Sequence, residues 1–122
     1  MDKPIISLED FKKIDIKIGE ILSAEKVPET DKLLKLSVNF DEEKPRQIIS
    51  GISVYFPDPQ VLVGKKCSFV ANLEPRVIRG LESQGMILAI SGSLPVQAGD
   101  ANNNFFSLLE VSQDIPSGTS AK

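Results

Sequence analysis

The stretch IDIKIGEIL at residues 14–22 decides the fold class, because its apolar side chains recur at every second position. Charged residues separate the isoleucines at its start, which reads Ile14, Asp15, Ile16, Lys17 and Ile18. A period of two is that of a β-strand with one buried face. Gly19 interrupts the alternation before Ile21 and Leu22 resume it, which predicts a bulge or bend in a long, curved strand.

Further elements are short and are separated by turn residues. Ser7, followed by an acidic residue at position 10, predicts the start of a helix of two turns at most. Pro59 can begin one helical turn that Gly64 ends. Residues 117–122 are expected to form a frayed tail. Alternating or apolar runs predict strands at residues 34–38, 47–49, 66–71, 86–91 and around 106–109.

Five or six short strands, the first of them long and bulged, are typical of a small barrel. We therefore predict an all-β protein: an OB-fold with a five-stranded β-barrel, a short N-terminal helix and a C-terminal extension. A small β-sandwich is the alternative. The 122 residues fit one domain over 1–122, with a core at about 8–118.

The composition excludes several kinds of chemistry. With no histidine, the chain lacks the commonest general base and every Ser-His or Cys-His nucleophile. Its one cysteine, Cys67, cannot form an internal disulfide and is expected to be a buried structural thiol. No phosphate-binding loop is present, and the acidic cluster at 41–43 indicates a solvated turn rather than a metal site. We expect a binding module that is not an enzyme and uses no cofactor or metal ion.

Charge and hydropathy limit the partners and the location. The net charge of -3, from 14 basic and 17 acidic residues, argues against a surface that is basic throughout. Residues 60–90 hold four basic residues against two acidic ones, so binding to nucleic acid would have to be local. No apolar run approaches the ~18 residues of a membrane span, and the N-terminus lacks the apolar segment of a signal peptide. We expect a cytoplasmic protein without a membrane segment.

The connection at residues 72–85 carries the side chains best suited to a ligand. Arg76 and Arg79 lie three residues apart and can present two guanidinium groups to phosphates. Groups that can hydrogen-bond to bases, 2′-hydroxyls or backbone come from Asn72, Ser83 and Gln84. On these residues alone two interpretations stay open: an RNA-binding loop over a rigid barrel, and an ordinary solvated loop.

Five blocks occur in order along the chain: FKKIDIKIG at 11–19, DKLLKL at 31–36, RQIISGI at 46–52, VANLEPR at 70–76 and SQGM at 83–86. Together they resemble the tRNA-binding domain family, which includes the C-terminal domain of bacterial methionyl-tRNA synthetase and a stand-alone tRNA-binding protein. The resemblance covers roughly residues 8–118. It implies an OB-fold that recognises the body of tRNA by its structure, usually as a homodimer. Such a domain acts in trans or is appended to an aminoacyl-tRNA synthetase.

The family's RNA-binding blocks match a small set of residues, most of them in the connection. These are Lys32, Asn72, Arg76, Arg79, Ser83, Gln84 and Met86. We expect the three basic residues to converge on one face, with the acidic turn at 41–43 pointing away. The chain departs from the family at residues 93–104, which are longer and more polar than the usual hairpin there.

A second function, from another class, shares the resemblance: a dimeric peptide-binding secretion chaperone. The block SQGM after Arg79 and Gly80 favours the tRNA-binding branch. One Tyr, no Trp and six Phe, most of them expected in the core, favour recognition of a folded RNA by shape and phosphates over base stacking. Apolar ends at residues 4–8 and 105–109 predict a two-fold self-contact, unless they only fill the ends of the barrel.

Overall fold

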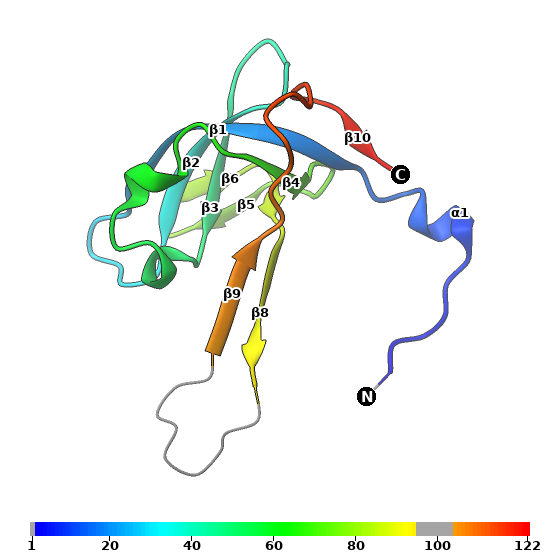
Figure 1. Cartoon of the computed structure of the whole chain (residues 1–122), viewed down its shortest axis with the longest axis horizontal. Helices are drawn as coiled ribbons and strands as arrows, with labels where there is room; N and C mark the ends of the chain where they lie inside the picture. Colours follow the sequence, from blue (N-terminus) through cyan, green and yellow to red (C-terminus); the bar gives the residue numbers. More distant parts are fainter. Residues whose placement is uncertain (1, 95–103) are drawn as a thin grey trace.

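The computed structural model describes residues 2–94 and 104–122, and its main feature is one antiparallel sheet. Five strands cross this sheet in the order β3 (Arg46–Ser50), β2 (Leu34–Asn39), β1 (Ile16–Lys26), β4 (Lys66–Val70) and β7 (Met86–Ile87). The sheet curls into a nearly closed barrel (Figure 1). This confirms the predicted all-β, OB-like barrel and decides against the β-sandwich.

Smaller elements are attached to the barrel. In chain order they are α1 (Leu8–Phe11), the 3-10 helices η1 (Ser53–Tyr55) and η2 (Pro59–Leu62), β5 (Arg76–Ile78), β6 (Leu81–Ser83), β8 (Ala89–Ser93), β9 (Asn104–Leu108) and β10 (Ser120–Ala121). The hairpin β8–β9 projects away from the barrel (Figure 1). Among the described residues, no helix is long and apolar enough to cross a membrane.

Most predicted elements lie close to their expected bounds. The strands predicted at 34–38, 47–49 and 66–71 are β2, β3 and β4, and η2 begins at Pro59 as expected. The strand predicted at 86–91 is divided into β7 and β8, and α1 has one turn rather than two, capped by the Ser7 hydroxyl. Most of the long stretch at 93–104 lies outside the described residues.

The bulge in β1 does not lie at Gly19 as predicted. The pairing with β4 runs through Gly19 without interruption, and the register with β2 shifts between Ile21 and Ser23 instead. Gly19 is needed for close packing: a Cβ atom there would lie 2.5 Å from a methyl group of Val38 and 2.8 Å from the ring of Phe40. The glycine therefore lets β2 and the residue after it pack directly against β1.

The core lies inside the barrel and follows the alternation of the strands. In β2, Leu34, Leu36 and Val38 are fully buried and the residues between them are not. Phe69 of β4 meets Phe40 edge to face, with ring centroids 5.2 Å apart. Cys67 is buried in the same core, as predicted, and burial raises the pKa of its thiol to about 11. The thiol therefore remains protonated at neutral pH.

The C-terminal residues are not a frayed tail, and that prediction is wrong. Gly118 donates its N–H to the carbonyl of Ile18, and the N–H of Ile18 donates to Thr119. The short strand β10 then continues the pairing along β1. β2 pairs with β1 only from Glu20 onward, so this edge of the start of β1 is free for the C-terminus. An edge strand has backbone N–H and C=O groups without a partner, and here the C-terminal residues form hydrogen bonds with them.

Replacing Gly19 with alanine is expected to lower the free energy of unfolding by about 1–3 kcal/mol, because the added methyl group overpacks the core. Urea unfolding followed by circular dichroism measures the change. Gly51→Ala is the control, since a Cβ atom at Gly51 meets no atom within 4 Å. Equal midpoints for the Gly19 variant and the parent would contradict the close-packing role of Gly19.

Candidate nucleic-acid interface

The connection at 72–85 is a β-hairpin rather than the irregular loop that its composition suggested. β5 and β6 pair through Arg76–Ser83, Val77–Glu82 and Ile78–Leu81. The turn between them has two residues, Arg79 with a φ of 53° and Gly80 with a φ of 79°. Positive φ at both central positions is the geometry of a type I′ turn. The usual Asn-Gly signal is replaced here by Arg-Gly, which is why sequence patterns missed the hairpin.

Two of the predicted cationic residues meet at the tip of this hairpin. Lys32 and Arg79 line one surface hollow of about 400 Å³, whose other lining residues are Thr30, Asp31, Leu33 and Ile78. The hollow joins the turn before β2 to the turn of the hairpin. It combines two cationic side chains with the apolar Leu33 and Ile78 and one acidic residue, Asp31, so its lining has an excess of positive charge that suits a sugar–phosphate backbone.

The third cation, Arg76, lies on the same hairpin. It is exposed and stands two residues before Ile78, so strand alternation places both side chains on one face of β5. Among the described residues, Lys32, Arg76 and Arg79 take part in no ion pair. Their charges are therefore available to an anionic ligand.

The acidic turn at 41–43 lies at the other end of β2 from Lys32. The six residues of β2 at about 3.3 Å each separate the two ends by roughly 20 Å. That distance exceeds the Debye length of about 8 Å at physiological salt, so the acidic turn weakens the potential at Lys32 little. Glu42, in addition, is paired with Arg46 at 2.7 Å, and the hydrogen bonds from Arg46 lower the pKa of its carboxyl group.

Ser83 and Gln84 face the barrel and complete its wall. The Ser83 hydroxyl accepts a hydrogen bond from the N–H of Ile49 at 3.0 Å, and the Gln84 side-chain oxygen accepts one from the N–H of Gln47 at 3.0 Å. The Gln84 N–H donates to the carbonyl of Gln47 at 2.8 Å. We call this junction of β3 with residues 82–84 the seam. Through these hydrogen bonds Ser83 and Gln84 hold the hairpin against β3.

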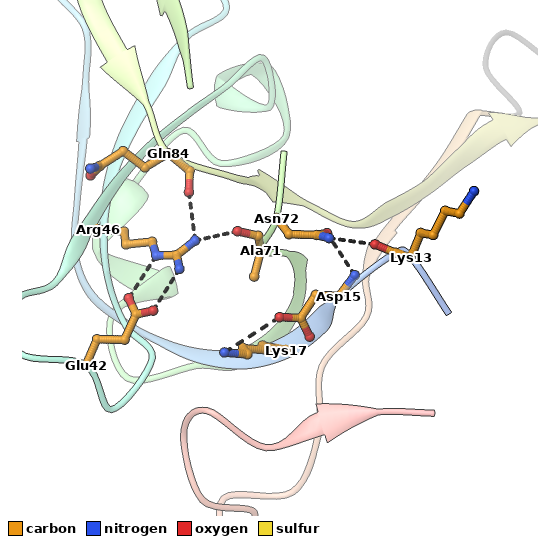
Figure 2. Close-up of polar contacts among 8 residues, drawn as sticks. All are labelled: Lys13, Asp15, Lys17, Glu42, Arg46, Ala71, Asn72 and Gln84. Carbon is orange, nitrogen blue, oxygen red and sulfur yellow. Dashed lines mark hydrogen bonds and ion pairs between the residues drawn. The ribbon is translucent and has the colours of Figure 1, made fainter. Parts of the chain in front are cut away.

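Asn72 is also occupied by backbone groups. Its side-chain oxygen accepts from the N–H of Asp15 at 2.8 Å, and its nitrogen donates to the carbonyl of Lys13 at 2.6 Å (Figure 2). The amide therefore joins the end of β4 to the chain between α1 and β1. Met86, by contrast, is 45% exposed on β7, and Gly85 beside it approaches β4, where a Cβ atom would lie 3.1 Å from the carbonyl oxygen of Val70.

Arg46 is a residue of this region that sequence reasoning did not single out. Its guanidinium group donates to Glu42, to the carbonyl of Ala71 and to the carbonyl of Gln84 (Figure 2). Glu42 is only 4 residues away, but no local pattern predicts the contacts with the two carbonyl groups, which are 25 and 38 residues away along the chain. The predicted residues therefore divide into three exposed cations with Met86, and three polar side chains that support the hairpin and its surroundings.

Comparison with known proteins identifies relatives of this chain by sequence and by fold. The tRNA binding domain family matches residues 16–120. The methionine–tRNA ligase of Deinococcus radiodurans is 44% identical over 118 residues, which are 97% of this chain and 16% of that protein. That of Methanospirillum hungatei is 48% identical over 116 residues, which are 95% of this chain and 15% of the ligase. The chain thus spans about a sixth of the length of these relatives.

Solved structures share the whole fold. A protein related to methionyl-tRNA synthetase from Pyrococcus horikoshii is 33% identical, with a TM-score of 0.80 over 98% of this chain and all of that one. The chaperone CsaA of Bacillus anthracis is 28% identical, with a TM-score of 0.74 over 98% of this chain and all of that one. The matched family is one of binding domains, so this chain is not an enzyme by itself. By sequence and by fold, it belongs to the tRNA-binding domain family.

Proposed function

We propose that this chain recognises the body of folded tRNA through the β5–β6 hairpin and the hollow beside it. The observation that carries the proposal is the meeting of Lys32 and Arg79, from distant parts of the chain, at one hollow. Neither side chain has an ion-pair partner among the described residues, so each can neutralise a phosphate. Arg76 extends the cationic surface along β5.

The proposed mode is recognition of shape and backbone rather than of unstacked bases. Of the six phenylalanines, Phe40 and Phe69 are buried, and Phe56 and Phe106 pack against the core. Tyr55 stacks on Phe106 with ring centroids 3.9 Å apart, so its ring is already partnered. A surface with few free aromatic faces suits phosphates and 2′-hydroxyls better than base stacking.

We further propose that the chain works as one cytoplasmic domain that supplies tRNA to an aminoacyl-tRNA synthetase, in trans or as an appended domain. The matched ligases are much longer than this chain, and binding tRNA beside a ligase raises the local concentration of the substrate. The domain would add affinity and leave the chemistry to the ligase.

Replacing Arg79 with asparagine is expected to weaken binding to tRNA about tenfold and to lower the slope of log affinity against log salt by about one unit, because one phosphate contact is lost. Asparagine adopts positive φ readily and is favoured in type I′ turns, so the hairpin should keep or gain stability. Gel shifts with bulk tRNA at three salt concentrations measure both quantities.

The control for Arg79→Asn is Lys122→Ala, because Lys122 lines a different hollow, with Leu8 and Phe11. It removes one positive charge from the chain away from the hairpin and should leave the slope unchanged. If both variants lower affinity and slope equally, total charge rather than the hairpin determines binding. If Arg79→Asn leaves affinity and slope as in the parent, Arg79 is not part of the site.

Asn72, whose amide is bonded to the backbone of Asp15 and Lys13, offers an uncharged test of the predicted site. Asn72→Ala should weaken tRNA binding while leaving the salt slope nearly unchanged, since the amide contacts no phosphate in this proposal. It should also lower the free energy of unfolding by about 0.5–1.5 kcal/mol, because the hydrogen bonds to Lys13 and Asp15 are lost. Salt titration and thermal unfolding of the same samples check both effects, and a tRNA affinity equal to that of the parent would remove Asn72 from the site.

Peptide binding is the second candidate function, and the likeness to the chaperone CsaA favours it. Exposed apolar side chains such as Ile90 and Phe105 on the β8–β9 hairpin would serve such a role. A chain that shifts no tRNA at tens of micromolar protein, yet suppresses the aggregation of a client protein, would establish the chaperone function instead.

We also propose a homodimer, because apolar residues at the N-terminus stand free of the barrel. Ile5 is fully exposed, and Ile6 and Leu8 are more than half exposed, so these residues do not fill the end of the barrel. Exposed apolar surface of this kind most commonly meets a second copy in a two-fold contact. Sedimentation equilibrium at micromolar concentration should give about twice the 13.3 kDa of the chain, and a species of 13.3 kDa would contradict the dimer.

A further inference from the structure

Arg46 joins the two ends of the segment that carries the hairpin. One of its terminal nitrogens donates to the carbonyl of Ala71 at 2.6 Å and to the carbonyl of Gln84 at 3.2 Å. Ala71 directly precedes residues 72–83, and Gln84 directly follows them. A single guanidinium group therefore fixes the separation of the two ends of this segment (Figure 2).

The other nitrogens of Arg46 are held in turn. The Nε–H donates to one carboxylate oxygen of Glu42 at 2.8 Å, and the second terminal nitrogen donates to the other oxygen at 2.7 Å. This two-point contact fixes the plane of the guanidinium group, because both parts are rigid and planar. Arg46 also lies over the ring of Phe40, 5.2 Å from the centroid. Its side chain is 23% exposed, and its hydrogen bonds go to groups of the protein itself.

We propose that Arg46, oriented by Glu42, is a positioning residue for tRNA binding: it sets the base of the β5–β6 hairpin, and thereby the place of Arg79 at its tip. This inference rests on the proposed function. Arg46 itself would touch no RNA. Its effect passes through Ala71 and Gln84 to the hairpin, whose tip must stay beside Lys32 for both cations to reach the same backbone.

The hydrogen bonds from Arg46 to the carbonyls of Ala71 and Gln84, which we call the clamp, are not the only contacts that hold this segment in place. Gln84 is paired with Gln47 through backbone and side chain, and Ser83 with Ile49, without Arg46. The N–H of Ala71 donates to the carbonyl of Asp15 at 2.7 Å, which holds the other end. Loss of the clamp should therefore loosen the hairpin while the barrel stays folded. Positioning and folding can be separated on this ground.

Glu42 gives the sharpest test, because positioning and charge predict opposite results. Glu42→Gln removes a negative charge, which by electrostatics alone should strengthen binding to an anionic RNA. If Glu42 orients Arg46, the same change should weaken tRNA binding about threefold and lower the salt slope. Glu43→Gln is the matched control: Glu43 is exposed, is adjacent in sequence and takes part in no ion pair among the described residues.

The experiment compares the parent with Glu42→Gln, Glu43→Gln and Arg46→Lys in tRNA binding at three salt concentrations. Thermal unfolding and backbone amide exchange of residues 76–83 are recorded on the same proteins. Lysine keeps the charge of Arg46 but cannot form the planar two-point contact, so we expect about tenfold weaker binding. We also expect faster exchange in the hairpin, in a protein that still unfolds cooperatively.

Each result decides the proposal. Weaker binding by Glu42→Gln, with Glu43→Gln equal to or tighter than the parent, supports positioning. Parent-like or tighter binding by Glu42→Gln overturns it, whether or not Arg46→Lys folds. If the parent and Arg79→Asn behave as proposed above while Glu42→Gln and Arg46→Lys bind like the parent, only the positioning role fails. If the parent binds no tRNA, both proposals fall.

Discussion

The seam between β3 and residues 82–84 is the contact on which the rest of the structure depends. β3 lies at one end of the main sheet and β7 at the other, so the barrel is incomplete until these ends meet. At the seam the N–H groups of Gln47 and Ile49 donate to the side chains of Gln84 and Ser83. A buried N–H without an acceptor costs about 1–3 kcal/mol, so these side chains take the place of a partner strand.

Because the seam and the hairpin are one stretch of chain, closing the barrel also places the cationic surface. The backbone that supplies Ser83 and Gln84 to β3 leads back through β6 to Arg79, which lines the same hollow as Lys32. In this stretch Ser83 and Gln84 face β3 and accept hydrogen bonds from it, whereas the exposed Arg76 and Arg79 take part in no ion pair among the described residues. The division follows from the fact that inward polar groups must be hydrogen-bonded, whereas outward charges are solvated.

The distribution of charge explains how an acidic chain can carry a cationic site. Five basic side chains among the described residues are engaged in ion pairs, those of Lys13, Lys17, Lys35, Arg46 and Lys65. Most of these pairs are partly exposed and contribute little to stability, but they neutralise basic groups away from the hollow. The cations at the hairpin take part in no ion pair among the described residues. A local field of this kind is compatible with a net charge of -3.

The sequence alone determined the elements whose signal is local. The alternation in residues 14–22 and 34–38 predicted β1 and β2, and Ser7 and Pro59 marked two helical starts, because side-chain period and capping depend on near neighbours. The burial of Cys67 was predicted in the same way, from the alternation in the strand expected at 66–71. The basic residues of the candidate site were also chosen without the structure, Arg76 and Arg79 from their spacing and Lys32 from the family resemblance, and their role stays a prediction.

Only the tertiary structure decided the features that depend on residues far apart in the chain. The strand β10 forms because β1 has a free edge, and the bulge in β1 falls at Ile21–Ser23 because β2 changes register there. The hydrogen bonds of Asn72 depend on a chain segment 57 and 59 residues away, and those of Arg46 on partners up to 38 residues away. The residue type of a hydrogen-bonding side chain does not reveal whether its partner is a ligand or a carbonyl group of the same protein. Only the folded chain shows which partner it has.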